Sequence, residues 1–196
     1  MPLPRSDTAH MRKERGFTLI ELLVVLTVSA ILLSLAAPSF SRLIQSTKIS
    51  GAVNTFLADL RFARSEAIRL GGTVTMCRSA NPETTSASGP TCGSGSTVGW
   101  ESGWIIFRDQ NNDATRDYNA DATLDDRVLR IQGPLSSIDS IAESGAATKF
   151  RFTATGRLYS VGSATSIQFG GANYDNKQQR IVCINLGGRA RIAGDG

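Results

Sequence analysis

The sequence predicts an α+β protein in which one long N-terminal helix packs on a mostly antiparallel β-sheet domain. An apolar run covers 21 residues from Phe17 to Ala37, and apolar residues then recur at helical spacing as far as Ile68. Beyond residue 71, short alternating segments are separated by stretches rich in Gly, Ser, Thr and Asn. Because helices seldom separate these segments, we expect their pairing to be antiparallel.

The apolar run predicts a membrane-spanning helix, since about 20 residues rising 1.5 Å each cross the hydrocarbon core. The preceding basic residues predict a cytoplasmic N-terminus and a translocated remainder. A cleaved secretory signal fits poorly, because the run is long and "SLAAPSF" is a poor cleavage site. A plain anchor leaves Glu21 unexplained, since an unpaired charge in lipid costs ~3 kcal/mol or more.

The stretch "RGFTLIELLVVLTVSAIL" resembles the class III signal of type IV pilins and type II secretion pseudopilins. The resemblance implies that prepilin peptidase cuts between Gly16 and Phe17, and that Phe17 is then N-methylated. It also implies that Glu21 pairs with the terminal amine of a neighbouring subunit. This pairing is physically reasonable, because side-by-side subunits neutralise two charges that are costly in isolation.

The resemblance divides the chain into four expected parts and implies a pilin-like fold. The protein would be a single-pass protein of the bacterial inner membrane with its head in the periplasm, and would later enter a pilus or pseudopilus. Pro38 should kink the helix or break its hydrogen-bond ladder, and Gly71-Gly72 should end it. The parts are a leader (1–16), a transmembrane and assembly helix (17–37), an amphipathic continuation (38–70) and a β-rich head (71–196).

The head contains eight predicted strands and three cysteines. A disulfide between Cys77 and Cys92 would close a turn-rich loop and stabilise the fold by ~3 kcal/mol. A pairing of Cys77 with Cys183 between strands is the alternative. With no Cys-x-x-Cys and only His10, a zinc site is not expected. The strands are "TVTMCR" from Thr73, "WIIFR" from Trp104, "RVLRI" from Arg127, "KFRFT" from Lys149, "RLYSV" from Arg157, "SIQF" from Ser166, "RIVCINL" from Arg180 and "RARIA" from Arg189.

A tryptophan-rich block resembles the Trp-x-x-Gly-Trp, Phe-x-Asp-x-Asn pattern of FimT/GspH-like pilins. With the leader, this resemblance covers most of the chain. The matching residues are Trp100, Gly103, Trp104, Phe107, Asp109 and Asn111.

The same block raises the question of calcium, because Asp109, Asn111 and Asp113 have the spacing that opens an EF-hand loop. The sixth position is Ala114 instead of glycine and the twelfth is Ala120 instead of glutamate. A solvated acidic loop is the plainer interpretation and a weak Ca²⁺ site is the alternative. We expect no other cofactor.

The end of the chain, "RIVCINLGGRARIAGDG", predicts a hairpin that turns at Gly187-Gly188. Arg189 and Arg191 are two residues apart, so in a strand they share a face, about 7 Å apart. Two such guanidinium groups can each bind phosphate oxygens without reading bases. In a two-residue turn Arg191 would lie opposite Ile184, which puts apolar groups on the arginine face.

The tail resembles the Gly-Arg-x-Arg motif of FimT-like minor pilins, which bind DNA with it in natural transformation. The motif falls on Gly188, Arg189 and Arg191, and Arg180 and Lys177 would add charge. The residues by themselves also fit an edge strand kept soluble by its arginines. Net charge is only +4, so a polyanion must be bound by a local patch.

Two functions follow from these resemblances. The first is a minor type IV pilin that binds double-stranded DNA and assists its uptake, with other pilin subunits and prepilin peptidase as further partners. The second is a type II secretion pseudopilin or a pilus-priming minor pilin with a purely structural role. We expect no enzyme, because no nucleophile, base and acid set is visible and His10 lies in the leader.

Overall fold

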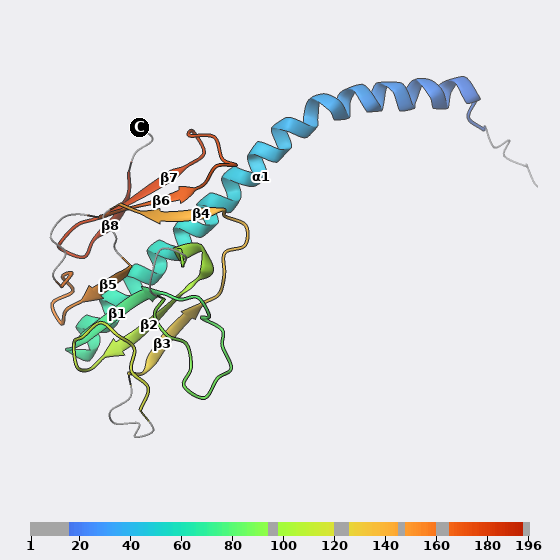
Figure 1. The fold of residues 1–196 in the computed structure, drawn as a ribbon. Helices are drawn as coiled ribbons and strands as arrows, with labels where there is room; N and C mark the ends of the chain where they lie inside the picture. Colours follow the sequence, from blue (N-terminus) through green and yellow to red (C-terminus); the bar gives the residue numbers. More distant parts are fainter. Residues whose placement is uncertain (1–15, 94–97, 120–125, 145–147, 160–164, 194–196) are drawn as a thin grey trace, which may run out of the picture. The chain divides into compact units, whose positions relative to one another are not determined.

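The structure is a computed structural model that describes residues 16–93, 98–119, 126–144, 148–159 and 165–193. Contacts divide the chain into two compact units, Met1–Arg42 and Leu43–Gly196. Helix α1 (Leu19–Leu70) contributes to both and continues through position 38, so Pro38 does not end it (Figure 1). Gly71 ends α1 in a left-handed conformation (φ 61°), and Gly72 N–H donates to the Ala67 carbonyl at 3.3 Å.

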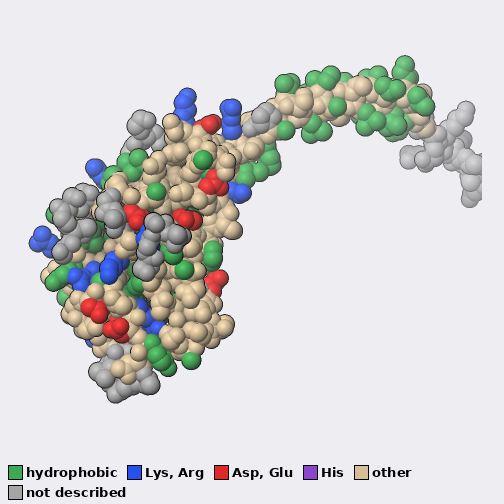
Figure 2. All heavy atoms as spheres, viewed as in Figure 1, with side chains coloured by type: hydrophobic (Ala, Val, Ile, Leu, Met, Phe, Trp, Pro, Cys, Tyr) green, Lys and Arg blue, Asp and Glu red, His purple; other side chains and the backbone are tan. Residues whose placement is uncertain are grey.

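The N-terminal unit presents apolar side chains to its surroundings. Leu19, Ile31 and Leu35 are all more than half exposed. Figure 2 shows hydrophobic side chains along the whole visible face of this part of the helix. The helix is long and apolar enough to cross a membrane, with a mean hydropathy of 2.6 in its most apolar window.

Within the described residues, the head contains two four-stranded sheets, which confirms the predicted antiparallel β-rich head. Every described pairing is antiparallel. The first sheet has the order β3-β2-β1-β5 and the second β4-β6-β7-β8 (Figure 1). The strands are β1 (Thr73–Arg78), β2 (Trp104–Asp109), β3 (Val128–Gln132), β4 (Ser140–Glu143), β5 (Lys149–Phe152), β6 (Thr165–Gly170), β7 (Arg180–Ile184) and β8 (Ala190–Ile192).

Two elements differ from the predicted strands. Strand β4 was not predicted, because four residues with one buried apolar side chain, Ile141, give a weak alternation. In the segment predicted as a strand from Arg157, the described residues 157–159 form only an isolated bridge, between Leu158 and Phe152, and the rest of that segment lies outside the described residues. It follows a tight turn at Gly156, whose φ is 72°.

Phe56 on α1 joins the helix to both sheets. Its ring makes edge-to-face contacts with Trp104 and Phe150 of the first sheet, at centroid distances of 5.3 and 6.2 Å. It makes the same kind of contact with Phe169 of the second sheet at 5.5 Å, and with Trp100 of the short helix η1 (Trp100–Ser102) at 5.3 Å. Such edge-to-face pairs stabilise the core beyond the contribution of the apolar area that the rings bury. The tryptophans of the recognised block are therefore core residues.

Candidate nucleic-acid interface

The β7–β8 hairpin carries the two predicted phosphate-binding arginines, and its turn is longer than predicted. Three residues, Leu186 to Gly188, lie between Asn185 and Arg189, whose backbones are joined by a 3.1 Å hydrogen bond. Asn185 Oδ1 accepts the Arg189 N–H at 3.0 Å, and Gly188 adopts a left-handed conformation with φ 72°. The predicted two-residue turn is wrong, because the left-handed residue is placed third, as in three-residue hairpins.

The longer turn changes which residue faces Arg191. Ile184 pairs with Ala190, and Cys183 pairs with Arg191. Residues that are opposite in a ladder share a face of the sheet. Arg191 therefore shares its face with Cys183, whose thiol is free, and not with the buried Ile184. The expected conflict between arginine and core residues is removed by this shift.

Gly188 is buried and closely packed on another loop. A β-carbon at this position would lie 2.3 Å from the carbonyl oxygen of Gly156 and 3.2 Å from the ring of Phe152. Leu158 N–H also donates to the Leu186 carbonyl at 3.1 Å. The glycine of the Gly-Arg-x-Arg motif thus has a packing role, and the turn is held on the loop that follows β5.

Both arginines of the hairpin are available to a ligand. The side chains of Arg189 and Arg191 are exposed. Across the described ranges, neither of them forms an ion pair. Residues 144–193 contain seven Lys or Arg and one acidic residue, Asp175, so this part of the chain is strongly basic although the whole is not.

Arg180 and Lys177 lie apart from the hairpin turn. Arg180 begins β7, at the end remote from the turn, and pairs with Phe169, whose side chain is buried. It stands three residues from Cys183, so strand alternation directs it to the opposite face from Arg191. Its guanidinium group donates to the carbonyls of Lys177 and Gln179 at 3.0 and 3.1 Å.

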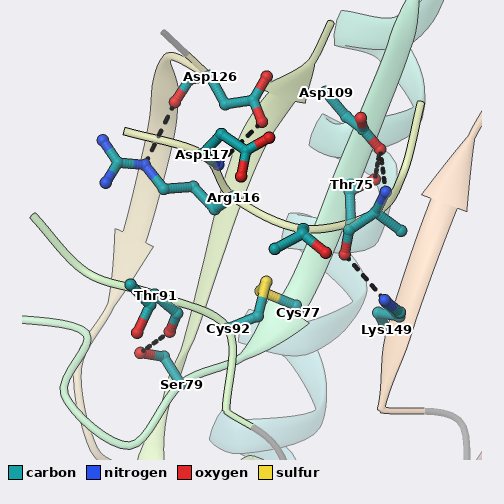
Figure 3. Close-up of a disulfide and its surroundings, with 12 residues drawn as sticks. Thr75, Cys77, Ser79, Thr91, Cys92, Asp109, Arg116, Asp117, Asp126 and Lys149 are labelled. Carbon is teal, nitrogen blue, oxygen red and sulfur yellow. Dashed lines mark hydrogen bonds between the residues drawn. A yellow bond between two sulfur atoms is a disulfide. The ribbon is translucent and has the colours of Figure 1, made fainter. Parts of the chain in front are cut away.

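The predicted calcium ligands close the β2–β3 loop on itself. Asp109 is 2% exposed, and its Oδ2 accepts hydrogen bonds from Thr75 and from the backbone of Ala114, each at 3.0 Å (Figure 3). Asn111 donates to Asp113 and Asp117 at 3.0 and 2.9 Å. The Asp-x-Asn-x-Asp spacing is therefore explained by side chains that hold the loop closed through hydrogen bonds.

Basic side chains also donate hydrogen bonds to carbonyl oxygens of this loop. Lys149 of β5 donates to the Ala114 carbonyl at 2.9 Å, and Arg151 donates to the Asn112 carbonyl. Among the residues that the structure describes, no three His, Cys, Asp or Glu side chains gather in a way that could hold a metal ion. Ala120, the predicted twelfth position, lies outside the described residues.

Cys77 and Cys92 form a disulfide, the loop pairing of the two that the sequence left open (Figure 3). Ser79 donates to the Thr91 carbonyl at 2.8 Å beside it. Arg116 of the β2–β3 loop donates to the carbonyl of Ser88, within the disulfide-closed loop. These contacts tie the long loop after β1 to the rest of the head.

Two family profiles match this chain. The profile described as "Type II transport protein GspH" matches residues 52–188, and the "Prokaryotic N-terminal methylation motif" matches residues 11–37. The chain belongs to the GspH family. The matched range includes the tryptophan block and ends at Gly188, so Arg189 and Arg191 lie just beyond it.

Solved structures of a minor pilin have a similar fold. Two crystal forms of the type IV minor pilin FimU of Pseudomonas aeruginosa share 18% and 17% identity with this chain. The similarity covers 74% and 76% of this chain and 93% and 90% of theirs, with TM-scores of 0.49 and 0.50. The likeness concerns the fold: a long N-terminal helix on antiparallel sheets. Among curated proteins, the chain has no match.

Family membership gives this GspH-family chain a minor pilin or pseudopilin-like role. Pilins of this kind are structural proteins, which associate with other pilin subunits after processing by prepilin peptidase. The methylation motif and the apolar helix indicate membrane anchoring before assembly. The matched motif contains Gly16, Phe17 and Glu21. The Glu21 N–H bonds the Thr18 hydroxyl at 3.3 Å, which caps the first turn of α1.

Proposed function

We propose that this minor pilin binds double-stranded DNA through the β7–β8 hairpin and assists DNA uptake in natural transformation. The observation that carries the proposal is the pair of exposed arginines, Arg189 and Arg191, on a hairpin whose turn is packed against the head. Neither forms an ion pair within the described part of the chain. Both are therefore available for phosphates.

The chemistry of the hairpin favours phosphate contact over base readout. A guanidinium group donates two parallel hydrogen bonds to phosphate oxygens, in a geometry that lysine cannot reproduce. Contacts to the phosphate backbone position a protein on the duplex but carry no direct sequence information. The expected binding is thus weakly dependent on sequence and strongly dependent on salt.

The N-terminal segment supplies the means of presenting this hairpin. In this proposal, residues 1–16 are removed, the amine of Phe17 is methylated, and Glu21 pairs with the amine of a neighbouring subunit. Before assembly, residues 17–37 span the inner membrane with the head in the periplasm. Isolated charges in lipid are costly, so pairing them favours incorporation into a filament.

A second candidate function is a pseudopilin or priming minor pilin that binds no nucleic acid. One observation favours it: the GspH profile ends at Gly188, so the two arginines are outside the part that the chain shares with the family. In that case the arginines would only protect the edge strand β8 from pairing with other chains.

DNA binding by the full chain in a nonionic detergent separates the two candidates. The test compares the unmodified chain with a double variant, Arg189→Ala with Arg191→Ala, using a fluorescent duplex at several salt concentrations. The control is Arg108→Ala with Arg127→Ala, which removes the same charge from exposed residues of β2 and of the segment before β3. We expect only the hairpin variant to lose affinity, with a log–log salt slope smaller by about 2. Equal binding by both variants would exclude the hairpin as the DNA site.

A further inference from the structure

We infer that Arg157 is a third phosphate-contacting residue of the same surface, brought to the hairpin by a contact between two glycines. The inference rests on the proposed function and adds to it a residue 32 positions away from Arg189 in the chain. Arg157 was predicted only as the first residue of a strand, and its described residues 157–159 form an isolated bridge instead.

The two arginines follow two equivalent glycines. The dipeptide Gly-Arg occurs at 156–157 and at 188–189 in this sequence. Gly156 and Gly188 have the same left-handed φ of 72°, which other residues rarely adopt. Each turn therefore ends on a left-handed glycine and continues directly into an arginine.

The two glycines lie against one another. A β-carbon on Gly188 would stand 2.3 Å from the Gly156 carbonyl oxygen, so the two backbones are already in contact. With 3.8 Å between successive α-carbons, the α-carbons of Arg157 and Arg189 are within about 14 Å of each other. DNA grooves are about 6 and 12 Å wide, so the two guanidinium groups can reach phosphates on one strand or across a groove.

Helix α1 holds this junction in place. Arg64 Nε donates to the same Gly156 carbonyl oxygen at 2.9 Å. A β-carbon on Gly156 would lie 2.7 Å from Ile68 Cδ1, so this loop is packed between the helix and the hairpin. The separation of Arg157 from Arg189 is therefore set by the folded head, and does not depend on a bound ligand.

The side chain of Arg157 has no structural task that would compete with a ligand. It is exposed, and it forms no ion pair or side-chain hydrogen bond with the described residues. Only its backbone is used, since its carbonyl accepts the Thr153 N–H at 2.9 Å and the Thr153 hydroxyl at 3.1 Å. The neighbouring Arg151 differs, because its guanidinium group stacks on Tyr159 and donates to Asn112.

The test measures duplex DNA affinity for the full chain in detergent, with Arg157→Ala, Arg157→Lys and the control Arg127→Ala. Arg127 precedes β3, at the opposite edge of the first sheet from β5, and its loss removes the same charge. We expect Arg157→Ala to weaken binding roughly five- to tenfold at ~0.1 M salt and to lower the salt slope by about 1. Arg157→Lys should keep the slope, and Arg127→Ala should keep both values.

The possible results separate this inference from the proposed function. If Arg157→Ala and Arg127→Ala bind alike while the hairpin double variant loses affinity, Arg157 makes no contact and the proposed function stands. If the unmodified chain binds no duplex at low salt, both are wrong. A matching thermal midpoint for Arg157→Ala and the unmodified chain would show that any lost affinity comes from the contact and not from unfolding.

Discussion

The indole Nε1 of Trp104 donates a 2.8 Å hydrogen bond to the carboxylate of Asp59, which is only 4% exposed. The other oxygen of the same carboxylate accepts Arg130 Nη1 at 2.7 Å, and the Arg130 guanidinium group lies 3.8 Å from the centroid of the Phe62 ring. One acidic residue of α1 therefore connects the helix to β2 and β3. A buried carboxylate is tolerated at this position because both of its oxygens have partners.

Replacing Asp59 by alanine should destabilise the head strongly. The change leaves the Trp104 N–H buried without an acceptor and removes the partner of Arg130, so we expect a loss of about 3 kcal/mol in the free energy of unfolding. Denaturant titration followed by tryptophan fluorescence measures it. Asn54→Ala, at an exposed position of the same helix, is the control and should change little. A similar small effect for both would mean that the buried network contributes nothing.

The two glycines of the hairpin turn should respond differently to alanine. At Gly188 the new β-carbon would meet the Gly156 backbone at 2.3 Å with φ at 72°, whereas at Gly187 its nearest neighbour is Asn185 Oδ1 at 3.3 Å. We expect Gly188→Ala to lower the free energy of unfolding by ~2 kcal/mol or more, and Gly187→Ala by much less. Thermal unfolding of the two variants measures the difference. Equal stability would show that the contact between Gly188 and Gly156 does not form.

Cys183 can report on DNA at the hairpin, because its thiol is free and the residue lies opposite Arg191 in the β7–β8 ladder. Bound duplex should slow alkylation of this thiol by a maleimide, since a phosphate backbone on Arg191 restricts access. Mass spectrometry of the alkylated chain gives the rate. In the Arg189→Ala, Arg191→Ala variant, DNA should leave the rate unchanged. Protection by DNA in neither protein, or equal protection in both, would contradict binding at this face.

Stability at alkaline pH should depend on Tyr174. Its hydroxyl donates to the Ser137 carbonyl at 2.6 Å, and burial, followed by the negative charge of Asp139, raises its pKa above the ordinary value of 10.0. A raised pKa in the folded state means that the neutral phenol stabilises the fold. This contribution is complete below pH 10 and is lost as pH rises through the folded-state pKa.

The measurement is the midpoint of thermal unfolding as a function of pH, for the Tyr174→Phe variant and for the unmodified chain. The phenylalanine variant should lose about 1 kcal/mol at neutral pH with its hydrogen bond, and should fall less steeply above pH 10. Tyr118→Phe, at an exposed tyrosine, is the control and should keep the original slope. A parallel decline in all three proteins would mean that Tyr174 does not couple ionisation to folding.

Glu21→Ala should leave proteolytic processing intact but reduce incorporation into pili. In the proposed assembly, a subunit without this carboxylate does not neutralise the terminal amine of a neighbour, while the proposed peptidase site at Gly16 is unchanged. Immunoblots of membranes and of sheared filaments measure both steps. Ser34→Ala, a polar residue that bonds the Ile31 carbonyl within the same helix, is the control. Normal incorporation of Glu21→Ala would contradict the pairing.

Two residues of the candidate site could be predicted from a short stretch of sequence, but the third could not. The Gly-Arg-x-Arg tail identifies Arg189 and Arg191 because those residues are only two positions apart in the chain. Arg157 joins them only through the packing of Gly156 on Gly188, a contact between segments that no local pattern connects. A repeated Gly-Arg dipeptide was the one signal that could have pointed to it.

What the sequence determined by itself is local. The apolar run after Phe17 determines a membrane-length helix, and Gly71 determines where that helix ends, because hydrophobic length and left-handed backbone preference belong to single segments. The tertiary structure decided how distant segments pair: the described strands form two separate sheets, and Arg191 lies opposite Cys183 in place of Ile184. A strand repeats every two residues, so one extra residue in a turn reverses every side chain after it. That extra residue is accommodated here because Gly188 adopts a left-handed φ of 72° at the third position of the turn, where it also packs against Gly156, far away in the chain.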